Sequence, residues 1–391
     1  MASRPAREAL PERSDFLDIV RAYAACAVVF EHIRLIWFTN PGKVVHLSAL
    51  EKIFYLLTGL GHQAVIAFFV LSGAAVGPSV WHQFQERRFS WPGYMAKRFS
   101  RLWAVVIPAL LLTWAIDAWG HALAPVLYET ATTIHRTPVM MRSNAAAFLG
   151  NVLFLQTYYS PIFGSNSPFW SLAAEFWFYV AFPILAVVAI RLRRWRLPVL
   201  LLGVSVMLVI FGPGFIAGLA IWSAGAAAML AAVVRSKRVA WAILVAGSLS
   251  GAFIAVATKT WFHGSREMLS DLVFGAVFAA ILWASRHAAF RQASARLSGF
   301  LRAEFLASYS FSVYAIHFPL LLFAAAALHH FQNMRPTLEG MACAVLLFFF
   351  TMVMARGFHL VFEANTRYLR TLLMRPVAFS CRLRRSQEPL R

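Results

Sequence analysis

Charged residues are scarce in this sequence. They make up 13% of the 391 residues, while 60% of the residues are hydrophobic; a typical soluble protein carries roughly 25% charged residues. Apolar runs of about 18 or more residues recur along the chain, which is the length that a helix needs to cross a bilayer. The runs do not alternate with a period of two, as the strands of a membrane barrel would. The sequence therefore predicts an all-α, polytopic transmembrane helical bundle.

Acidic residues are the scarcer charge. There are 16 Asp and Glu against 36 Lys and Arg, which gives a net charge of +20. The basic residues cluster between the apolar runs, in QERRF, YMAKRFSR, IRLRRWR, VRSKR, SRHAAFRQASARL and CRLRRSQEPLR. This distribution is typical of cytoplasmic loops under the positive-inside rule and indicates contact with anionic lipid, not nucleic acid.

Cysteine and cofactor motifs are also sparse. Cys26, Cys343 and Cys381 are far apart and predict neither a disulfide nor a zinc site. We find no Walker-type loop, no GxGxxG, no HxxxxD and no metal-ligand cluster, so we expect no metal and no bound cofactor. The N-terminal MASRPAREALPERSD lacks a signal-peptide core, and the first apolar run is expected to be a retained span in a bacterial inner (plasma) membrane.

Hydropathy and charge together predict ten spans with both termini in the cytoplasm. The expected spans are 16–38, 53–80, 102–124, 169–190, 197–211, 213–234, 239–257, 271–285, 305–328 and 338–362. The loops 81–101, 191–196, 235–238 and 286–304 then lie on one side, and each is basic. The predicted organisation is a tail over 1–15, a membrane domain over 16–366 and a basic tail over 367–391.

Residues 144–159, NAAAFLGNVLFLQTYY, are apolar enough to suggest a further span. Counting this segment as a span would place RLRRWR outside and invert every later loop. We therefore predict a re-entrant or interfacial helix on the outer side, joined to the next span by SPIFGSNSPF. An ordinary eleventh span remains the alternative.

The first span carries ionisable residues, which are costly inside a membrane and usually face the bundle interior. Arg21 and His32 are eleven positions apart, close to three helical turns, so they share one face and lie roughly 16 Å apart along the axis. We expect both to line one cavity. Snorkelling of Arg21 to the inner interface, and a structural hydrogen-bonded role for His32, are the alternatives.

The fourth span reads FWSLAAEFWFYVAFP and places Ser171 and Glu175 on one face, with Tyr179 close to it. Glu175 and His32 reach similar depths from opposite directions. We therefore expect a hydrogen bond between them, which would set the imidazole tautomer. The alternative is that Glu175 pairs with another group, such as Arg34, to stabilise the bundle.

Further polar groups complete the candidate site. Arg98 and Arg101, spaced i, i+3 in YMAKRFSR, suit a phosphate clamp, although basic residues are common at any inner boundary. Ser72 either faces a cavity or bonds its own backbone. Tyr314 and His317 in ASYSFSVYAIHFPLLL lie at mid-membrane depth, and the polar density of this span indicates a lined cavity.

These segments together resemble the acyltransferase-3 family of integral membrane acyltransferases. The resemblance covers about residues 16–365 and rests on LDIVRAYAACAVVFEH, AFFVLSG, the KRFSR arginine pair, FWSLAAEFWFYVAFP and SYSFSVYAIHFPL. The chain departs from the family pattern at the end of its last span. Many members have a Glu-Lys-Pro-like motif there, whereas this chain reads FEANTR around Glu363. Because the tail is short and basic, we also expect no fused esterase-like domain of the kind some members have.

The resemblance implies transfer of an acyl group, often acetyl, from acyl-CoA to a hydroxyl of a carbohydrate or lipid-linked glycan, as in O-acetylation of a polysaccharide. It implies that His32 is essential and that Arg98 and Arg101 take part in acyl-CoA binding or catalysis. We expect His32 to act as general base or as acyl carrier, with Glu175 orienting it. We expect the phosphates of acyl-CoA, the co-substrate, to bind near Arg98 and Arg101 with Arg21 nearby, and loop 160–168 and Trp170 to shape the acceptor site. The residues alone also fit a proton-coupled transporter or flippase, or a non-catalytic assembly subunit. The sequence indicates no oligomeric state.

Overall fold

The computed structural model describes residues 15–371, apart from residues 45, 133–135, 193, 261–264 and 369. This part of the chain is built from helices and contains no β-strand beyond two isolated bridges. The α-helices are α1 (Asp15–Trp37), α2 (Ala49–Leu57), α3 (Gly61–Gln85), α4 (Trp91–Leu123), α5 (Pro125–Glu129), α6 (Ala145–Val152), α7 (Trp170–Arg191), α8 (Arg196–Phe211), α9 (Pro213–Leu230), α10 (Lys237–Thr260), α11 (Ser265–Ser285), α12 (Ala288–Leu301), α13 (Ala303–Ser308), α14 (Ser310–Ala327) and α15 (Leu338–Val361). Four short 3₁₀ helices are η1 (Pro41–Lys43), η2 (Met140–Arg142), η3 (Ser167–Phe169) and η4 (Glu363–Asn365). The predicted all-α membrane bundle is confirmed.

Each of the ten predicted spans falls on helical residues. Within the described ranges, 8 helical segments are long and apolar enough to cross a membrane, with α2 and α3 counted as one. Two predicted spans, α1 and α8, are not in this count, and each is left out for a physical reason. α1 has 23 residues but carries Asp15, Asp18, Arg21, Glu31 and Arg34. α8 has 16 residues and is therefore only about 24 Å long, below the roughly 30 Å of a bilayer core.

Three boundaries differ from the prediction. The expected span 53–80 is interrupted, since α2 ends at its C-cap Thr58 and α3 begins at Gly61. α4 begins at Trp91, inside the expected loop 81–101, because Ser90 caps it by accepting from the Gly93 amide. The expected loop 286–304 is largely the helix α12. The arginine pair therefore lies on a continuous helix.

The segment 144–159 forms no long helix. α6 has 8 residues, about 12 Å, which is too short to cross a bilayer. Asn144 caps its start by accepting from the Ala147 amide. The chain then turns back, with the Trp103 indole of α4 donating to the Val152 carbonyl. These features fit the predicted non-crossing helix and not an eleventh span.

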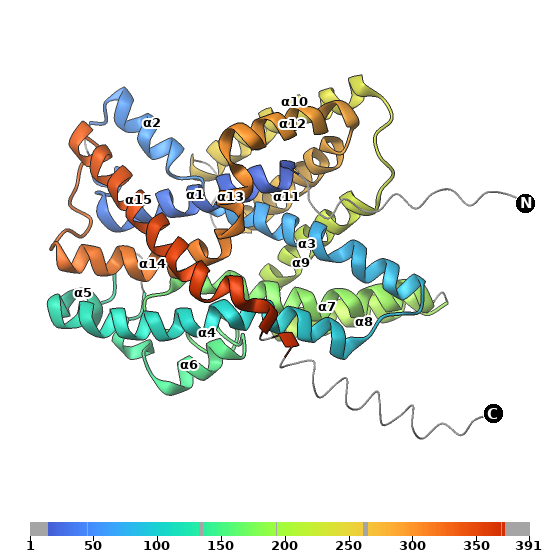
Figure 1. Cartoon of the computed structure of the whole chain (residues 1–391), viewed down its shortest axis with the longest axis horizontal. Coiled ribbons are helices and arrows are strands. Elements are labelled where there is room, and N and C mark those ends of the chain that lie inside the picture. Colours follow the sequence, from blue (N-terminus) through green and yellow to red (C-terminus); the bar gives the residue numbers. More distant parts are fainter. Residues whose placement is uncertain are drawn as a thin grey trace, which may run out of the picture.

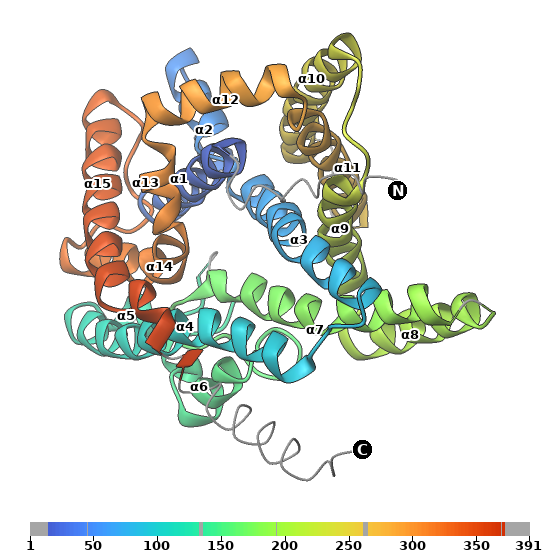
Figure 2. The same cartoon turned by 45° about the vertical axis from the view of Figure 1, so that its right-hand side comes forward.

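α1 and α3 lie at the centre of the bundle. α1 packs against α3, α12, α13, α14 and α15, and α3 packs against α1, α7, α9 and α11 (Figures 1 and 2). α4, α5 and α6 lie together at one edge, and the α10–α11 pair lies at another. The spans containing α3 and α14 are 72% and 78% buried, against 17% for α10. A polar cavity is therefore expected between these inner helices.

Small residues let α3 and α9 cross closely. A Cβ on Gly73 would lie 1.8 Å from the Trp222 carbonyl oxygen, and one on Gly225 would lie 2.0 Å from the Val70 oxygen. Backbone cannot move aside as a flexible side chain can. This contact fixes Trp222, whose indole reaches the polar site described below.

Gly73→Ala is therefore expected to destabilise the bundle by about 1–3 kcal/mol, the usual cost of overpacking. Thermal unfolding in detergent measures the effect as a lowered Tm. Gly203→Ala on α8 is the matched control, because a Cβ there has nothing within 4 Å. Equal Tm values for the two variants would contradict the close-crossing argument.

Candidate active site

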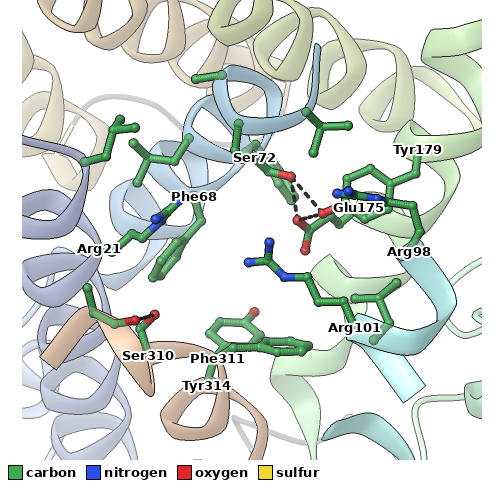
Figure 3. A pocket seen from close by; sticks show the side chains of 18 of the residues that line it. Arg21, Phe68, Ser72, Arg98, Arg101, Glu175, Tyr179, Ser310, Phe311 and Tyr314 are labelled. Atoms are coloured by element: carbon green, nitrogen blue, oxygen red, sulfur yellow. Dashed lines mark hydrogen bonds between the residues drawn. The ribbon is translucent and has the colours of Figure 1, made fainter. Parts of the chain in front are cut away.

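The main cavity has a volume of about 1050 Å³ and lies between α1, α3, α4, α7, α13 and α14 (Figure 3). This volume is at the upper end of the range for small-molecule sites, roughly 300–1,000 Å³. Eight of the ten predicted site residues line it, namely Arg21, Ser72, Arg98, Arg101, Ser171, Glu175, Tyr179 and Tyr314. The cavity also reaches Pro78 and Ser79 in the last third of α3, and Glu363 and Arg370 after α15.

Three arginines face this cavity from two helices. Figure 3 shows Arg21 of α1 on one side and Arg98 and Arg101 of α4 on the other. The Arg21 guanidinium pairs with the Asp18 carboxylate at 3.5 Å, so part of its charge is compensated. Arg98 and Arg101 are one turn apart, and their positive charge is directed into the cavity.

Two aromatic rings hold Arg98 in place. Its guanidinium carbon lies 5.6 Å from the centroid of the Tyr94 ring and 5.4 Å from that of the Tyr179 ring, within the range of cation–π attraction. Its Nε is buried and has no hydrogen-bond partner among the described residues. A buried unpaired donor is costly, and an anionic ligand oxygen would satisfy it.

Glu175 belongs to a hydrogen-bond network that joins α3, α7 and α9. Its Oε1 accepts hydrogen bonds from the Ser72 hydroxyl at 2.6 Å and the Tyr179 hydroxyl at 2.5 Å. The Trp222 indole of α9 donates to the Ser72 oxygen at 3.1 Å. Ser72 thus bonds across helices, in place of the local backbone bond that was the alternative. Trp222 is a site residue that sequence reasoning missed, because its polar partner lies 150 positions away.

The expected hydrogen bond between His32 and Glu175 is wrong. His32 Nδ1 lies 2.9 Å from His317 Nε2 of α14, and the His32 ring meets the Phe318 ring edge-on at 5.0 Å. Arg34, the other partner considered for Glu175, pairs with Glu31 at 3.3 Å. Similar depth in the membrane was insufficient to identify the partner of His32. α14 packs against α1 and places His317 beside His32.

His32 lines a second cavity of about 350 Å³. The other lining residues come from the end of α1, the loop after it, η3, α14 and the loop after α14, namely Arg34, Leu35, Phe38, Thr39, Asn40, Ser167, Phe318 and Gln332. Ser167 belongs to the segment expected to shape the acceptor site, whereas Trp170 packs its ring against Phe69, 6.1 Å away. Aromatic faces here adjoin amide and hydroxyl groups.

The expected single cavity joining Arg21 to His32 is therefore two cavities. α1 and α14 contribute to both: on α14, Tyr314 faces the first cavity and Phe318 the second, four positions apart, about 6 Å along the axis. The Tyr314 hydroxyl lies 2.5 Å from the Ser171 oxygen and 2.8 Å from the Pro168 carbonyl oxygen. These bonds join α14 to η3 and α7 and make a one-turn layer between the cavities.

A buried network holds the segment 160–168 against α4. Asp117 is only 1% exposed, and its Oδ2 accepts from the Ser165 amide at 2.7 Å. Gly164 adopts a φ of 55°, and a Cβ there would lie 2.4 Å from that carboxylate oxygen. Asn166 donates to the Ala315 carbonyl at 2.8 Å. Sequence reasoning missed Asp117, although a carboxylate within the apolar run TWAIDAWG was a usable signal.

Glu363, which lies where the chain departs from the family motif, also lines the main cavity. Its Oε2 accepts from the Ser312 hydroxyl at 2.5 Å, from the Ser312 amide at 3.2 Å and lies 3.0 Å from His359 Nδ1. These bonds tie the end of α15 to the start of α14. Within the described residues, no group of three or more His, Cys, Asp and Glu side chains is placed to hold a metal ion.

Comparison with known proteins gives one family match. A family model described as an acyltransferase domain matches residues 14–356, well over half of the chain. The matched range contains all ten candidate site residues. No curated protein and no solved structure matches the chain.

Proposed function

The chain belongs to the acyltransferase-3 family of integral membrane acyltransferases, and on that premise we propose that it moves an acyl group, in the simplest case acetyl, from acyl-CoA to a hydroxyl of a carbohydrate acceptor. The observation that carries this proposal is the division of the candidate residues between two cavities, with the three arginines in the larger one and His32 in the smaller one. The thioester bond of the donor breaks and an ester bond forms. The hydroxyl proton leaves through His32 and ends on the CoA thiol.

The main cavity is the proposed donor site. Its mouth includes Ser79, Glu304 and Arg370, next to the basic segments that the positive-inside rule assigns to the cytoplasm. Acyl-CoA is a cytoplasmic metabolite with several phosphate groups, and planar guanidinium groups bind phosphate in two-pronged fashion. Arg98 and Arg101 are the proposed phosphate ligands, and Arg21 is a weaker third because Asp18 compensates it.

The second cavity is the proposed acceptor site. Phe38 and Phe318 offer apolar ring faces, and Asn40 and Gln332 offer amide groups, a combination that suits the alternating apolar and hydroxyl faces of a sugar. Its volume of about 350 Å³ lies near the lower end for ligand sites, roughly 300 Å³. A small part of a larger glycan would enter, and the remainder would stay outside. His32 is the proposed general base, a role worth typically ~10²–10⁴-fold in rate.

The acyl group has to pass the layer formed by Tyr314, Ser171 and Pro168. The layer is one helical turn thick, about 6 Å, and a pantetheine arm is long enough to enter it from the donor side. Opening of the Tyr314 hydrogen bonds to Ser171 and Pro168 would join the two cavities. The acyl donor and the acceptor would then meet inside the protein, while the solutions on the two sides of the membrane stay separate.

The test uses the purified protein in nanodiscs and radiolabelled acetyl-CoA. We expect binding of acetyl-CoA and a slow release of CoA and acetate, with water in place of the acceptor, and ester formation when a glycan acceptor is added. Absence of binding of acetyl-CoA and of longer acyl-CoAs to folded protein would overturn the proposal.

A proton-coupled transporter or flippase is the second candidate. One observation favours it: two cavities on opposite sides of a closed layer are also the arrangement of an alternating-access carrier. The two functions give opposite results in proteoliposomes. A carrier moves a labelled glycan across the membrane without releasing CoA, whereas the acyltransferase releases CoA and esterifies the glycan.

A further inference from the structure

The contact between His32 and His317 indicates which of their ring nitrogens carry protons. His317 Nδ1 lies 3.0 Å from the Val313 carbonyl oxygen and 2.9 Å from the Tyr314 carbonyl oxygen. Carbonyl oxygens only accept hydrogen bonds, so this nitrogen must carry a proton. In a neutral imidazole the other nitrogen, Nε2, then carries the lone pair. That nitrogen is the one that faces His32 at 2.9 Å.

The charge state of His317 follows from its burial. Its side chain is 0% exposed, and its hydrogen-bond neighbours are two carbonyl oxygens and the imidazole of His32. None of these groups is an anion. Burying a charge without a counter-ion is costly, so the neutral form is favoured. Neutral His317 can only accept a hydrogen bond from His32 at Nε2.

His32 must then donate from Nδ1. A neutral His32 with its proton on Nδ1 has its lone pair on Nε2, the nitrogen on the other side of the ring. The second cavity is lined by His32 and not by His317, and Nε2 is the His32 nitrogen that does not face His317. The opposite tautomer would leave an N–H where the base is needed.

We infer that His317 is a positioning residue, which fixes the tautomer of His32 so that Nε2 is the base for the acceptor hydroxyl. This inference rests on the proposed acyl transfer. His317 occupies the place of the carboxylate that orients histidine in a Ser-His-Asp triad, with a neutral acceptor in place of an anion. When His32 takes the hydroxyl proton on Nε2, its Nδ1–H still points at the His317 lone pair. The two carbonyl oxygens polarise His317 further and help it to share the positive charge.

The test compares two replacements of the same residue. Leucine removes the acceptor, whereas glutamine can accept from His32 through Oε1 and donate to a backbone carbonyl through its amide. We expect His317→Leu to lower kcat for acetyl-CoA hydrolysis by roughly 100-fold or more, the range of general-base effects. We expect KM for acetyl-CoA to stay within about twofold, because the arginines lie in the other cavity. His317→Gln should recover kcat to within about tenfold of wild type.

Each outcome has a defined meaning. Wild-type kcat in His317→Leu would overturn the inference, and so would equal losses in His317→Leu and His317→Gln, since both would then report packing alone. If the leucine variant does not fold, His317→Asn replaces it. The asparagine side chain is one methylene shorter than that of glutamine and cannot bond both His32 and a backbone carbonyl. Equal activity of His317→Asn and His317→Gln would therefore contradict the inference. A wild-type protein that neither binds nor hydrolyses acetyl-CoA would instead remove the proposed function itself.

Discussion

His32→Ala is expected to lower the turnover of acetyl-CoA by about 10²–10⁴-fold, the usual contribution of a general base, and to leave its Kd unchanged. The separation of effects follows from the two cavities. His32 lines the smaller one, and the three arginines line the larger one. Release of CoA by purified protein in nanodiscs measures turnover, and equilibrium binding of labelled acetyl-CoA measures Kd.

A matched control removes a histidine elsewhere. His82 lies exposed on the last turn of α3, outside both cavities, and His82→Ala should behave as wild type. Turnover in His32→Ala above about a tenth of the wild-type rate would rule out His32 as the base. A large rise in Kd together with lost turnover would place His32 in donor binding instead.

The fold was largely predictable because its determinants are local. A run of about 20 apolar residues has few alternatives to a helix in a bilayer, and all ten predicted ranges fall on helices. The errors also have local causes. The break between α2 and α3 lies at the C-cap Thr58, and the early start of α4 depends on the Ser90 cap. Capping residues determine where a helix begins or ends. A hydropathy average over many residues does not detect such single positions.

The arginine pair was predictable for a similar reason. Arg98 and Arg101 are three positions apart, so any helix places them on one face whatever the tertiary fold. The partner of His32 was not predictable in this way, since His317 is 285 positions away. Similar depth in the membrane led us to expect Glu175 as the partner, whereas His317 was expected only to line a cavity. Only the packing of α14 against α1 distinguishes them.

The division into two cavities depends on single side chains. Tyr314 was predicted as a lining residue, and it does line the main cavity. Its hydroxyl also reaches Ser171 and the Pro168 carbonyl, and these contacts close the layer. The position of Pro168 in turn depends on Asp117 and Asn166, which hold the preceding turn against α4 and α14. Such a chain of contacts has no periodic signal in the sequence.

The layer also explains why the polar groups are distributed between two networks. Glu175, Ser72, Tyr179 and Trp222 bond to one another on the donor side. His32 and His317 bond on the acceptor side. We interpret the first network as support for the arginine cavity, since Tyr179 both bonds Glu175 and stacks on Arg98. Glu175 is then a positioning group for the donor site, in place of its expected role beside His32.

The arginine pair gives the second large expected effect: Arg98→Ala combined with Arg101→Ala should raise the Kd for acetyl-CoA by roughly 100-fold. A hydrogen bond to a charged group contributes about 1.5 kcal/mol or more, so two such bonds amount to about 3 kcal/mol, or about two powers of ten in Kd. Equilibrium binding of labelled acetyl-CoA, with unlabelled CoA as competitor, measures the change. CoA should compete as well as acetyl-CoA, because the phosphates and not the acyl group contact the arginines.

Two controls separate a specific clamp from general positive charge. Arg87 and Arg88 lie in the same basic connection between α3 and α4 but outside both cavities, so replacing both with alanine removes equal charge and should leave Kd within about twofold. Arg98→Lys keeps the charge but loses the planar group that stacks on Tyr94 and Tyr179. We expect this variant to bind more weakly than wild type. If the Arg87/Arg88 variant weakened binding as much as the Arg98/Arg101 variant, long-range attraction alone would account for donor binding, and the cavity arginines would have no role as a clamp.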